Sequence, residues 1–260
     1  TKNGKVLAKL EGESWRMQTQ IEGEVYSGID NYEMLHEAGF LLGSFHRVLN
    51  NCNITFRSNL ILHQTKTIYQ RLLDSECKYT CDATDVKESL VFLKKEMPKY
   101  FLPNTLPVRV IHGDPKISNI IFNNKKAVAL IDLDTCNKQN ILVELGDAFR
   151  SWCGGTEDDD MNYFDVEKFK YAWHGYFDGS VGMLSIQEKS LIIRSIGTIT
   201  LELASRFLTD YFEDSYFGWD NIRYKTRKDH NLARCLGQLA QFKSYKTNKM
   251  HLEEMIMSKT

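Results

Sequence analysis

The feature that most constrains this chain is a run of eight residues that gathers charged and polar side chains between apolar stretches. It reads His-Gly-Asp-Pro-Lys-Ile-Ser-Asn and covers residues 112–119. Residues 120–131 follow it and have the pattern of a β-hairpin, with two apolar runs around an Asn-Asn-Lys-Lys turn. Such a hairpin brings Asn119 and Asp132 near each other at its open end. Asp114 precedes the first strand, so we expect one end of one hairpin to hold all three groups.

These three groups suit the transfer of a phosphoryl group to an alcohol. That reaction needs a group that positions or deprotonates the hydroxyl, metal ligands beside the phosphates, and cations around the transferred group. Asp114 supplies an acceptor for the proton, whereas Asn119 and Asp132 supply the hard oxygen ligands that Mg²⁺ prefers. Lys116 either steadies the γ-phosphate through its charge or is a solvated loop lysine. The alternative for the other three is that they are turn and strand-end residues around Pro115.

Composition and charge exclude several classes of protein. The chain has 260 residues, which is enough for one large domain or two unequal ones. With a formal net charge of −1 and no long basic run, it is a poor partner for nucleic acid or an anionic membrane. The most apolar stretch, residues 191–208, contains three charged residues and therefore predicts a buried helix and no membrane span. The 6 cysteines of the chain are scattered along the sequence, which favours the reducing cytoplasm.

The periodicity of apolar residues predicts an α+β protein that is mostly helical. A first hairpin is expected near the N-terminus, with strands over residues 5–10 and 15–21, and a short strand is expected over residues 108–111. The expected helices are residues 31–50, 59–75, 84–100, 143–152, 165–177, 186–212 and 229–247.

The His-Gly-Asp-x-x-x-x-Asn run, followed by Ile-Asp-x-Asp at residues 131–134, resembles the aminoglycoside phosphotransferase and choline kinase superfamily. The resemblance implies a protein-kinase-like fold. Residues 1–23 would be the remnant of a truncated N-terminal β lobe with the inter-lobe linker. Residues 24–260 would be a large, mainly helical C-terminal lobe that carries the catalytic hairpin.

The same resemblance implies the roles of the motif residues and the cofactors. Asp114 would be the catalytic base, with Lys116 beside it. Asn119 and Asp132 would bind Mg²⁺, ATP would be the phosphoryl donor, and His112 would brace the loop. The glycine-rich phosphate loop and the strand lysine of this fold are not found in the sequence. An inactive, binding-only fragment of such a kinase therefore stays an alternative.

The chain is also similar to the N-acetylhexosamine 1-kinase branch of that superfamily. The similarity includes the Trp15-Arg16 strand, the Gly146-Asp147 segment, residues 206–217 and residues 230–234. It implies an ATP-dependent kinase that phosphorylates a sugar hydroxyl, with the anomeric hydroxyl of an N-acetylhexosamine as the expected acceptor. Choline and aminoglycosides are alternative acceptors.

Two residues are candidates for the acceptor pocket. Arg206 has a planar donor fork that suits sugar hydroxyls, and Tyr216 offers a stacking face or a hydroxyl. The alternative is an exposed i, i+4 charge ladder made of Glu202, Arg206 and Asp210.

For the nucleotide, the resemblance places adenine against the backbone of Gln20, Ile21, Glu22 and Gly23. Ile121 and Ile131 would form the apolar floor, or else belong to the plain core.

Three acidic features have less specific expectations. Asp147 is expected to be a structural carboxylate that ties the loop to the next helix. Asp134 either supports the metal ligand beside it or caps a strand. The acidic run at residues 157–160 is expected to be a solvated surface, and it is the one local candidate for a wall that attracts a cationic acceptor.

Overall fold

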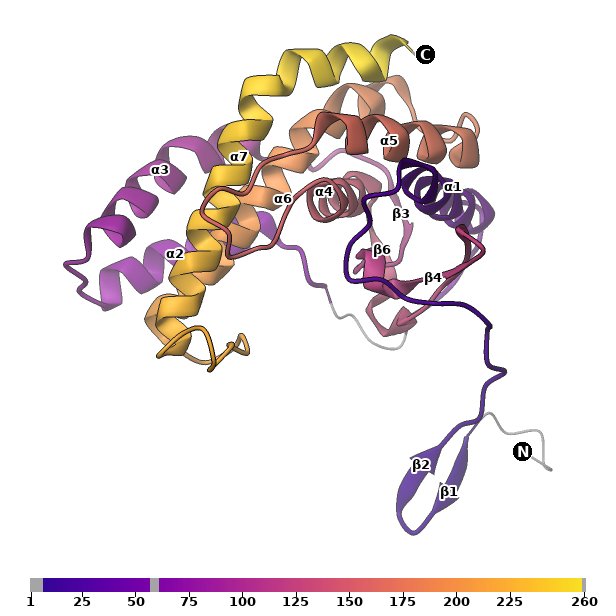
Figure 1. Ribbon diagram of the computed structural model, residues 1–260, viewed down its shortest axis with the longest axis horizontal. Coiled ribbons are helices and arrows are strands. Elements are labelled where there is room, and N and C mark those ends of the chain that lie inside the picture. The colour runs from indigo at the N-terminus through magenta and orange to yellow at the C-terminus, as the bar shows by residue number, and fades with distance from the viewer. Residues whose placement is uncertain (1–6, 57–60, 259–260) are drawn as a thin grey trace.

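The computed structural model describes residues 7–56 and 61–258. Figure 1 shows a helical body from which one small hairpin projects, so the prediction of a mainly helical chain is confirmed. The helices of the described residues are α1 (Tyr32–Leu49), α2 (Thr65–Lys78), α3 (Thr84–Tyr100), α4 (Ile141–Trp152), α5 (Val166–Ser180), α6 (Ile186–Glu213) and α7 (Arg227–Ser258).

The projecting hairpin consists of β1 (Ala8–Leu10) and β2 (Glu13–Trp15), which pair antiparallel. The two residues between them both have positive φ, as tight hairpin turns require. The predicted second strand, residues 15–21, is wrong beyond its first residue. Residues 16–22 are exposed and pair with no other strand of the described chain, so nothing holds them extended in a sheet. The start of the predicted first strand, residues 5–6, lies outside the described residues.

Two further antiparallel pairs surround residues 112–119, which we call the motif loop. β4 (Ile120–Asn123) pairs with β5 (Lys126–Leu130) through a two-residue turn with positive φ at both positions, which confirms the predicted hairpin. β3 (Val108–Ile111) pairs with β6 (Asn137–Asn140). β6 is not predicted from the sequence, because its Asn-Lys-Gln-Asn run has no alternating apolar residues.

α1 and α5 lie side by side because glycines face each other where the helices touch. A Cβ at Gly39 would overlap a backbone oxygen of α5, and a Cβ at Gly175 would overlap a backbone oxygen of α1. Gly43 and Gly179 repeat this arrangement one turn further along. The backbones therefore approach more closely than side chains would permit.

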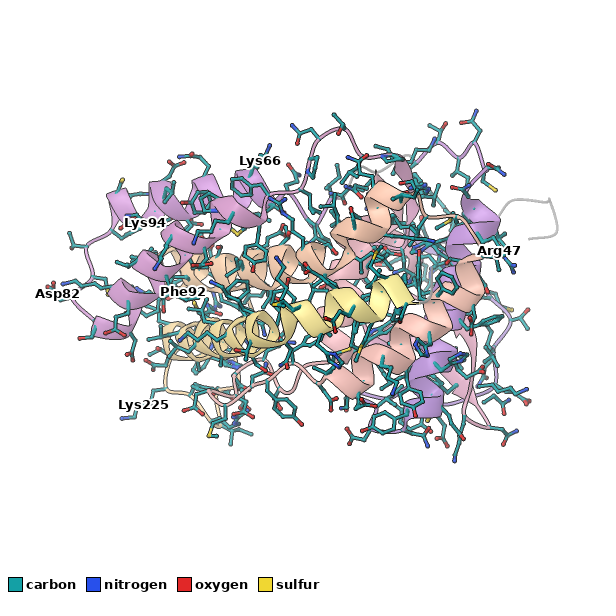
Figure 2. All side chains as sticks on the ribbon, turned by 90° about the horizontal axis from the view of Figure 1, so that it is seen from above. Arg47, Lys66, Asp82, Phe92, Lys94 and Lys225 are labelled. Atoms are coloured by element: carbon teal, nitrogen blue, oxygen red, sulfur yellow. The ribbon has the colours of Figure 1, made fainter. Side chains whose placement is uncertain are left out.

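α6 is the central helix and packs against α7, α4, α2 and α3. A capping box made by Ser185 and Glu188 begins it. α2 and α3 form a helical pair at one end of the molecule. In Figure 2, Asp82 marks the connection between them and Arg47 marks the opposite end. Within residues 7–56 and 61–258, no helix has the length and apolarity of a membrane span.

Helix ends differ from the predictions where local contacts decide them. α4 begins two residues before the predicted start, because the Asn140 side chain accepts the backbone N–H of Leu142 as an N-cap. α7 continues to Ser258, eleven residues past the predicted end, and buries Leu252 and Ile256. α2 begins at residue 65 and not at 59.

Candidate functional site

The motif loop holds the Asp114 carboxylate between an amide and an ammonium. Asn119 Nδ2 donates to Asp114 O at 2.9 Å and to Asp114 Oδ2 at 3.2 Å. Lys116 Nζ lies 2.7 Å from the same Oδ2. The side chain of Asp114 is 24% exposed. The carboxylate is therefore fixed by its neighbours and still open to a ligand.

His112 ties this loop to the far strand of the hairpin. Its Nδ1 accepts the backbone N–H of Asp114 at 3.3 Å, which leaves the proton on Nε2. Nε2 then donates to Ile131 O at 2.8 Å. Thr135 Oγ1 donates to His112 O at 2.9 Å. The buried imidazole thus braces the loop, in agreement with the expectation from the sequence.

Glu144 of α4 supports the motif loop through the backbone of Gly113, a role that no sequence pattern predicts. Its Oε2 accepts the backbone N–H of Gly113 at 2.6 Å, and its Oε1 lies 2.6 Å from His46 Nε2. The ring of His46 also contacts the hydroxyl of Tyr176 at 3.0 Å. Burial raises the pKa of Glu144, but these partners outweigh it and the pKa falls below its usual value. A charged glutamate therefore anchors the backbone next to Asp114.

Gly113 shows why the loop needs a glycine. Its φ is +89°, and a Cβ there would lie 2.5 Å from the backbone oxygen of Thr135. Both the conformation and the space exclude a larger residue.

The hairpin places Asp132 beside Asn119. The backbone N–H of Ile131 donates to Asn119 O at 2.9 Å, so the two predicted metal ligands share the open end of the β4–β5 ladder. Asp132 is exposed and has φ 64° and ψ 53°, a left-handed conformation that costs free energy in any residue other than glycine. Backbone outliers of this kind gather at functional sites.

The donor set at this end fits a hard cation. Asn119 Nδ2 is engaged with Asp114, which leaves Oδ1 as its oxygen ligand, and Asp132 adds an exposed carboxylate. In the described part of the chain, no cluster of three His, Cys, Asp or Glu side chains could hold a metal. An amide and one carboxylate suit Mg²⁺, which keeps several waters and takes its remaining ligands from phosphates.

Lys116 is electrostatically linked to these acids. Burial lowers the pKa of Lys116, but its hydrogen bond to Asp114 and the charges of Asp114, Asp132 and Asp147 raise it above the usual value. The lysine therefore stays positively charged beside the carboxylates.

The segment predicted to contact adenine, residues 20–23, meets the β4–β5 hairpin at Gly23. Glu24 and Phe122 exchange backbone hydrogen bonds of 2.8 and 2.9 Å. A Cβ at Gly23 would lie 2.5 Å from both Ile121 Cγ2 and Phe122 O. Gln20, Ile21 and Glu22 are exposed, and Ile121 and Ile131 are half-buried. The structure thus brings Gly23 to Ile121 and leaves the three preceding residues in solvent.

Arg206 and Tyr216 line a common pocket of about 230 Å³, with Thr209 and Asp210. The Arg206 guanidinium lies 5.7 Å from the centre of the Tyr216 ring and 5.4 Å from that of Phe217. No described residue of the motif loop lines this pocket. The structure therefore joins these two predicted residues but gives them a cavity separate from Asp114.

The alternative of an exposed charge ladder on α6 is wrong. Glu202 is fully buried and lies 2.8 Å from His63 Nδ1. Asp210 accepts three backbone N–H groups of residues 215–217. The carboxylates on either side of Arg206 are thus engaged elsewhere, and Asp210 shapes the turn that presents Tyr216.

Asp147 belongs to a buried charge network. Its Oδ1 accepts Arg150 Nη2 at 2.9 Å, and its Oδ2 lies 3.8 Å from His63 Nε2. Burial raises the pKa of Asp147, but the two cations lower it well below its usual range. This geometry agrees with the expected structural carboxylate. Asp134 is exposed in the short 3-10 turn Leu133–Thr135.

The prediction that the acidic run at residues 157–160 is a solvated surface is wrong for Asp158. The side chain of Asp158 is 5% exposed and contacts Arg223, Tyr224 and His230 at 2.9 to 3.1 Å. Its negative charge is therefore already neutralised, whereas residues 159 and 160 are exposed.

The motif loop and the hairpin around it lie inside a recognisable family segment. Residues 3–175 match the profile of the phosphotransferase enzyme family. This chain belongs to the phosphotransferase enzyme family. The match covers the motif loop, the hairpin and α4, so the superfamily membership expected from the sequence is confirmed.

Solved structures of other phosphotransferases share the fold at low sequence identity. A choline/ethanolamine kinase family protein from Mesorhizobium loti is 14% identical with a TM-score of 0.51, over 86% of this chain and 69% of that one. Amicoumacin kinase in complex with AMP-PNP, Ca²⁺ and its ligand is 12% identical with a TM-score of 0.50, over 88% and 69%. The gentamicin–APH(2")-IIa complex is 13% identical with a TM-score of 0.52, over 92% and 79%. These likenesses confirm the expected protein-kinase-like fold.

Proposed function

We propose that this member of the phosphotransferase family transfers the γ-phosphoryl group of ATP to a sugar hydroxyl. The anomeric hydroxyl of an N-acetylhexosamine is the acceptor we propose. The observation that carries the proposal is the Asp114 carboxylate, which Lys116 and Asn119 hold in place with one side open. Family membership supports the reaction type. The similarity of residues 206–217 to N-acetylhexosamine 1-kinases supports the acceptor.

In this proposal Asp114 orients the acceptor hydroxyl and receives its proton as the oxygen attacks the phosphoryl group. Lys116 neutralises Asp114 before substrates bind. When its ammonium moves to the γ-phosphate oxygens, Asp114 regains its full negative charge. Binding of the donor would thus prepare the base for the acceptor.

Asn119 and Asp132 are the proposed Mg²⁺ ligands. Bound Mg²⁺ would supply positive charge that neutralises the phosphate oxygens during transfer. Asn119 would have a second role, because its amide nitrogen holds Asp114 and its side-chain oxygen would be the metal ligand. The amicoumacin kinase complex contains a nucleotide analogue together with Ca²⁺, which supports a divalent cation in the proposed reaction.

The nucleotide would lie between the linker and the hairpin. We propose the backbone of Gln20, Ile21, Glu22 and Gly23 as the adenine contact, with Ile121 and Ile131 below the ring. The contact between Gly23 and Ile121 supports this placement. The exposure of residues 8–22, compared with the pairing of Glu24 with Phe122, supports a division of the chain into residues 1–23 and residues 24–260.

The charges around the site support a sugar over a cationic acceptor such as choline or an aminoglycoside. A cationic acceptor needs unpaired acidic groups, and Asp158 is already paired with Arg223 and His230. Arg206 and Tyr216 offer donors and an aromatic face, which suit sugar hydroxyls and the apolar face of a sugar ring. We propose that they bind the part of the acceptor that lies away from Asp114.

The test is ATP consumption by the full-length protein with Mg²⁺ and N-acetylglucosamine or N-acetylgalactosamine. Replacing Asp114 with Asn should lower kcat by about 10²- to 10⁴-fold, the usual contribution of a general base. Asp82→Asn, at the exposed connection between α2 and α3, is the matched control and should retain full activity. An unchanged rate in Asp114→Asn would remove the assignment of the base. Acceptor-independent hydrolysis alone would contradict the kinase assignment.

A further inference from the structure

A pocket of about 430 Å³ lies where the start of α2 meets the β3–β6 ladder. Its lining residues are 61, 63–67, 101–104, 106, 108, 138–140 and 143. Val108 pairs with Asn140 at this end of the ladder, whereas Ile111, which precedes the motif loop, pairs with Asn137 at the other end. The two ends are three residue steps apart, which is about 10 Å. Among the described residues, none of the motif loop lines this pocket, and only Ile61 also lines the pocket of about 230 Å³ described above.

Two lysines line the pocket, and neither has a carboxylate partner in the part of the chain that the structure describes. Lys66 Nζ lies 3.3 Å from Asn104 Oδ1 and 5.8 Å from the centre of the Phe101 ring, and both of these residues also line the pocket. Figure 2 shows Lys66 at the end of α2 that lies away from Asp82. Lys138 is exposed on β6 and forms no ion pair with a described residue. Neither aspartate nor glutamate occurs among the described lining residues, so both ammonium charges are uncompensated.

The buried charges behind the pocket balance one another. His63 lines the pocket, and although burial lowers its pKa, Glu202 and Asp147 raise it to about 10. The imidazole is therefore a cation at neutral pH, in contact with both carboxylates. Asp147 also contacts Arg150, which is the second buried cation. Two buried cations and two buried carboxylates leave no net charge, so the charge that a ligand meets is that of the two lysines.

The remaining wall of the pocket is apolar. It consists of Ile61, Phe101, Leu102, Pro103, Leu106, Val108 and Val143. Small-molecule sites combine such apolar walls with a few polar groups that fix the ligand, and they have volumes of about 300–1,000 Å³. The pocket thus offers an apolar surface for the body of a ligand and two ammonium groups for its charged end.

We propose that this pocket binds a phosphate monoester with an aromatic or aliphatic body. The phosphate would lie between Lys66 and Lys138, and the body would lie against the apolar wall beside Phe101. A phosphate monoester carries a charge of about −1.5 to −2 at pH 7, which matches two ammonium groups. Hydrogen bonds between charged partners of this kind are the strong ones. The site goes beyond the proposed phosphoryl transfer and does not depend on it, because its described lining includes no residue of the motif loop.

Phenyl phosphate and benzyl alcohol test this site, because both carry an aromatic ring and only the first is an anion. Each would be titrated into ¹⁵N-labelled protein at low salt and pH 7.5 without Mg²⁺, and the backbone amide shifts followed by NMR. Phenyl phosphate should shift the amides of residues 101–104 and 138–140 and should bind at least about tenfold more tightly than benzyl alcohol. Lys66→Glu and Lys138→Glu should each weaken its binding by about tenfold.

Lys95→Glu is the matched control, because it makes the same change of charge at an exposed position of α3 that does not line the pocket. It should leave the affinity for phenyl phosphate unchanged. Lys116→Met should leave it unchanged as well, and a loss of binding in that variant would place the anion at the motif loop and overturn the proposal. The proposal is also overturned if phenyl phosphate causes no shifts at residues 101–104 and 138–140. The same holds if the folded Lys66 and Lys138 variants keep the wild-type affinity.

Discussion

His63 is a buried cation held between carboxylates of two helices. Glu202 of α6 lies 2.8 Å from one ring nitrogen, and Asp147 of α4 lies 3.8 Å from the other. Burial lowers the pKa of His63, but the two carboxylates raise it to about 10. The imidazolium therefore joins α4 and α6 beside the site.

Replacing His63 with Gln should destabilise the protein in a pH-dependent way. The pKa of His63 is higher in the folded protein than in an unfolded chain, so its charge stabilises the fold fully below about pH 6.5. That contribution disappears as the pH rises through about 10. The loss should reach about 3–5 kcal/mol near pH 6, because two buried carboxylates lose their cation, and should shrink toward pH 10.

Urea unfolding of wild-type and variant protein at pH 6 and pH 9.5 measures this difference. His251→Gln is a suitable control, because His251 is exposed on α7. A deficit of the same size at both pH values would contradict a charged His63.

Single residues near the hairpin were predictable because the chain itself sets their positions. Asn119 and Asp132 lie at a distance from the turn that the ladder fixes, so sequence spacing placed them together. No sequence spacing of this kind predicts the positions of Glu144 and His63. Glu144 meets His46 across 98 positions of sequence and His63 meets Glu202 across 139, and only the packing of helices creates those contacts.

At the scale of elements, the contact between α1 and α5 depends on glycines. Each of them leaves room for a backbone carbonyl of the opposite helix. Gly175→Ala should lower the free energy of unfolding by about 1–3 kcal/mol, because its Cβ would overlap the backbone oxygen of His36. The higher helix propensity of alanine works in the opposite direction and is worth about 1 kcal/mol. Chemical denaturation measures the net change.

Gly218→Ala is the control for that substitution, because a Cβ at Gly218 would meet no atom within 4 Å. Its stability should match that of the wild type. If Gly175→Ala were as stable as Gly218→Ala, the helices would have room to separate, and the close contact would not be needed for the fold.

Helices were predicted more accurately than strands, for a physical reason. The apolar period of a helix is local, so α1, α3 and α6 appeared in the sequence with nearly correct ends. A strand depends on its partner. β6 forms because β3 lies beside it, although its own residues are polar, and residues 16–21 form no strand despite their suitable pattern.

At the scale of the whole molecule, the packed body begins after the N-terminal hairpin and the linker. Residues 8–22 are exposed throughout, and Ile29 is the first buried hydrophobic side chain of the described residues. Deleting residues 1–22 should therefore change the melting temperature by less than about 2 °C. Differential scanning calorimetry measures this.

Ile29→Ala is the comparison for that deletion. It removes a buried side chain and should cost about 2–5 kcal/mol, with a clear fall in melting temperature. A deletion that destabilised the protein as much as Ile29→Ala would show that the first 22 residues are part of the folded body, and would contradict the proposed division of the chain.

The two backbone hydrogen bonds between Glu24 and Phe122 give the linker a mechanical role. These two bonds attach the exposed N-terminal chain to β4, the strand that directly follows the motif loop. The chain continues from Glu24 through the buried Ile29 into α1, so a pull on the N-terminal hairpin would act on β4 and on the first helix together (Figure 1). The linker thus ties the strand that follows the motif loop to both the exposed hairpin and the helical body.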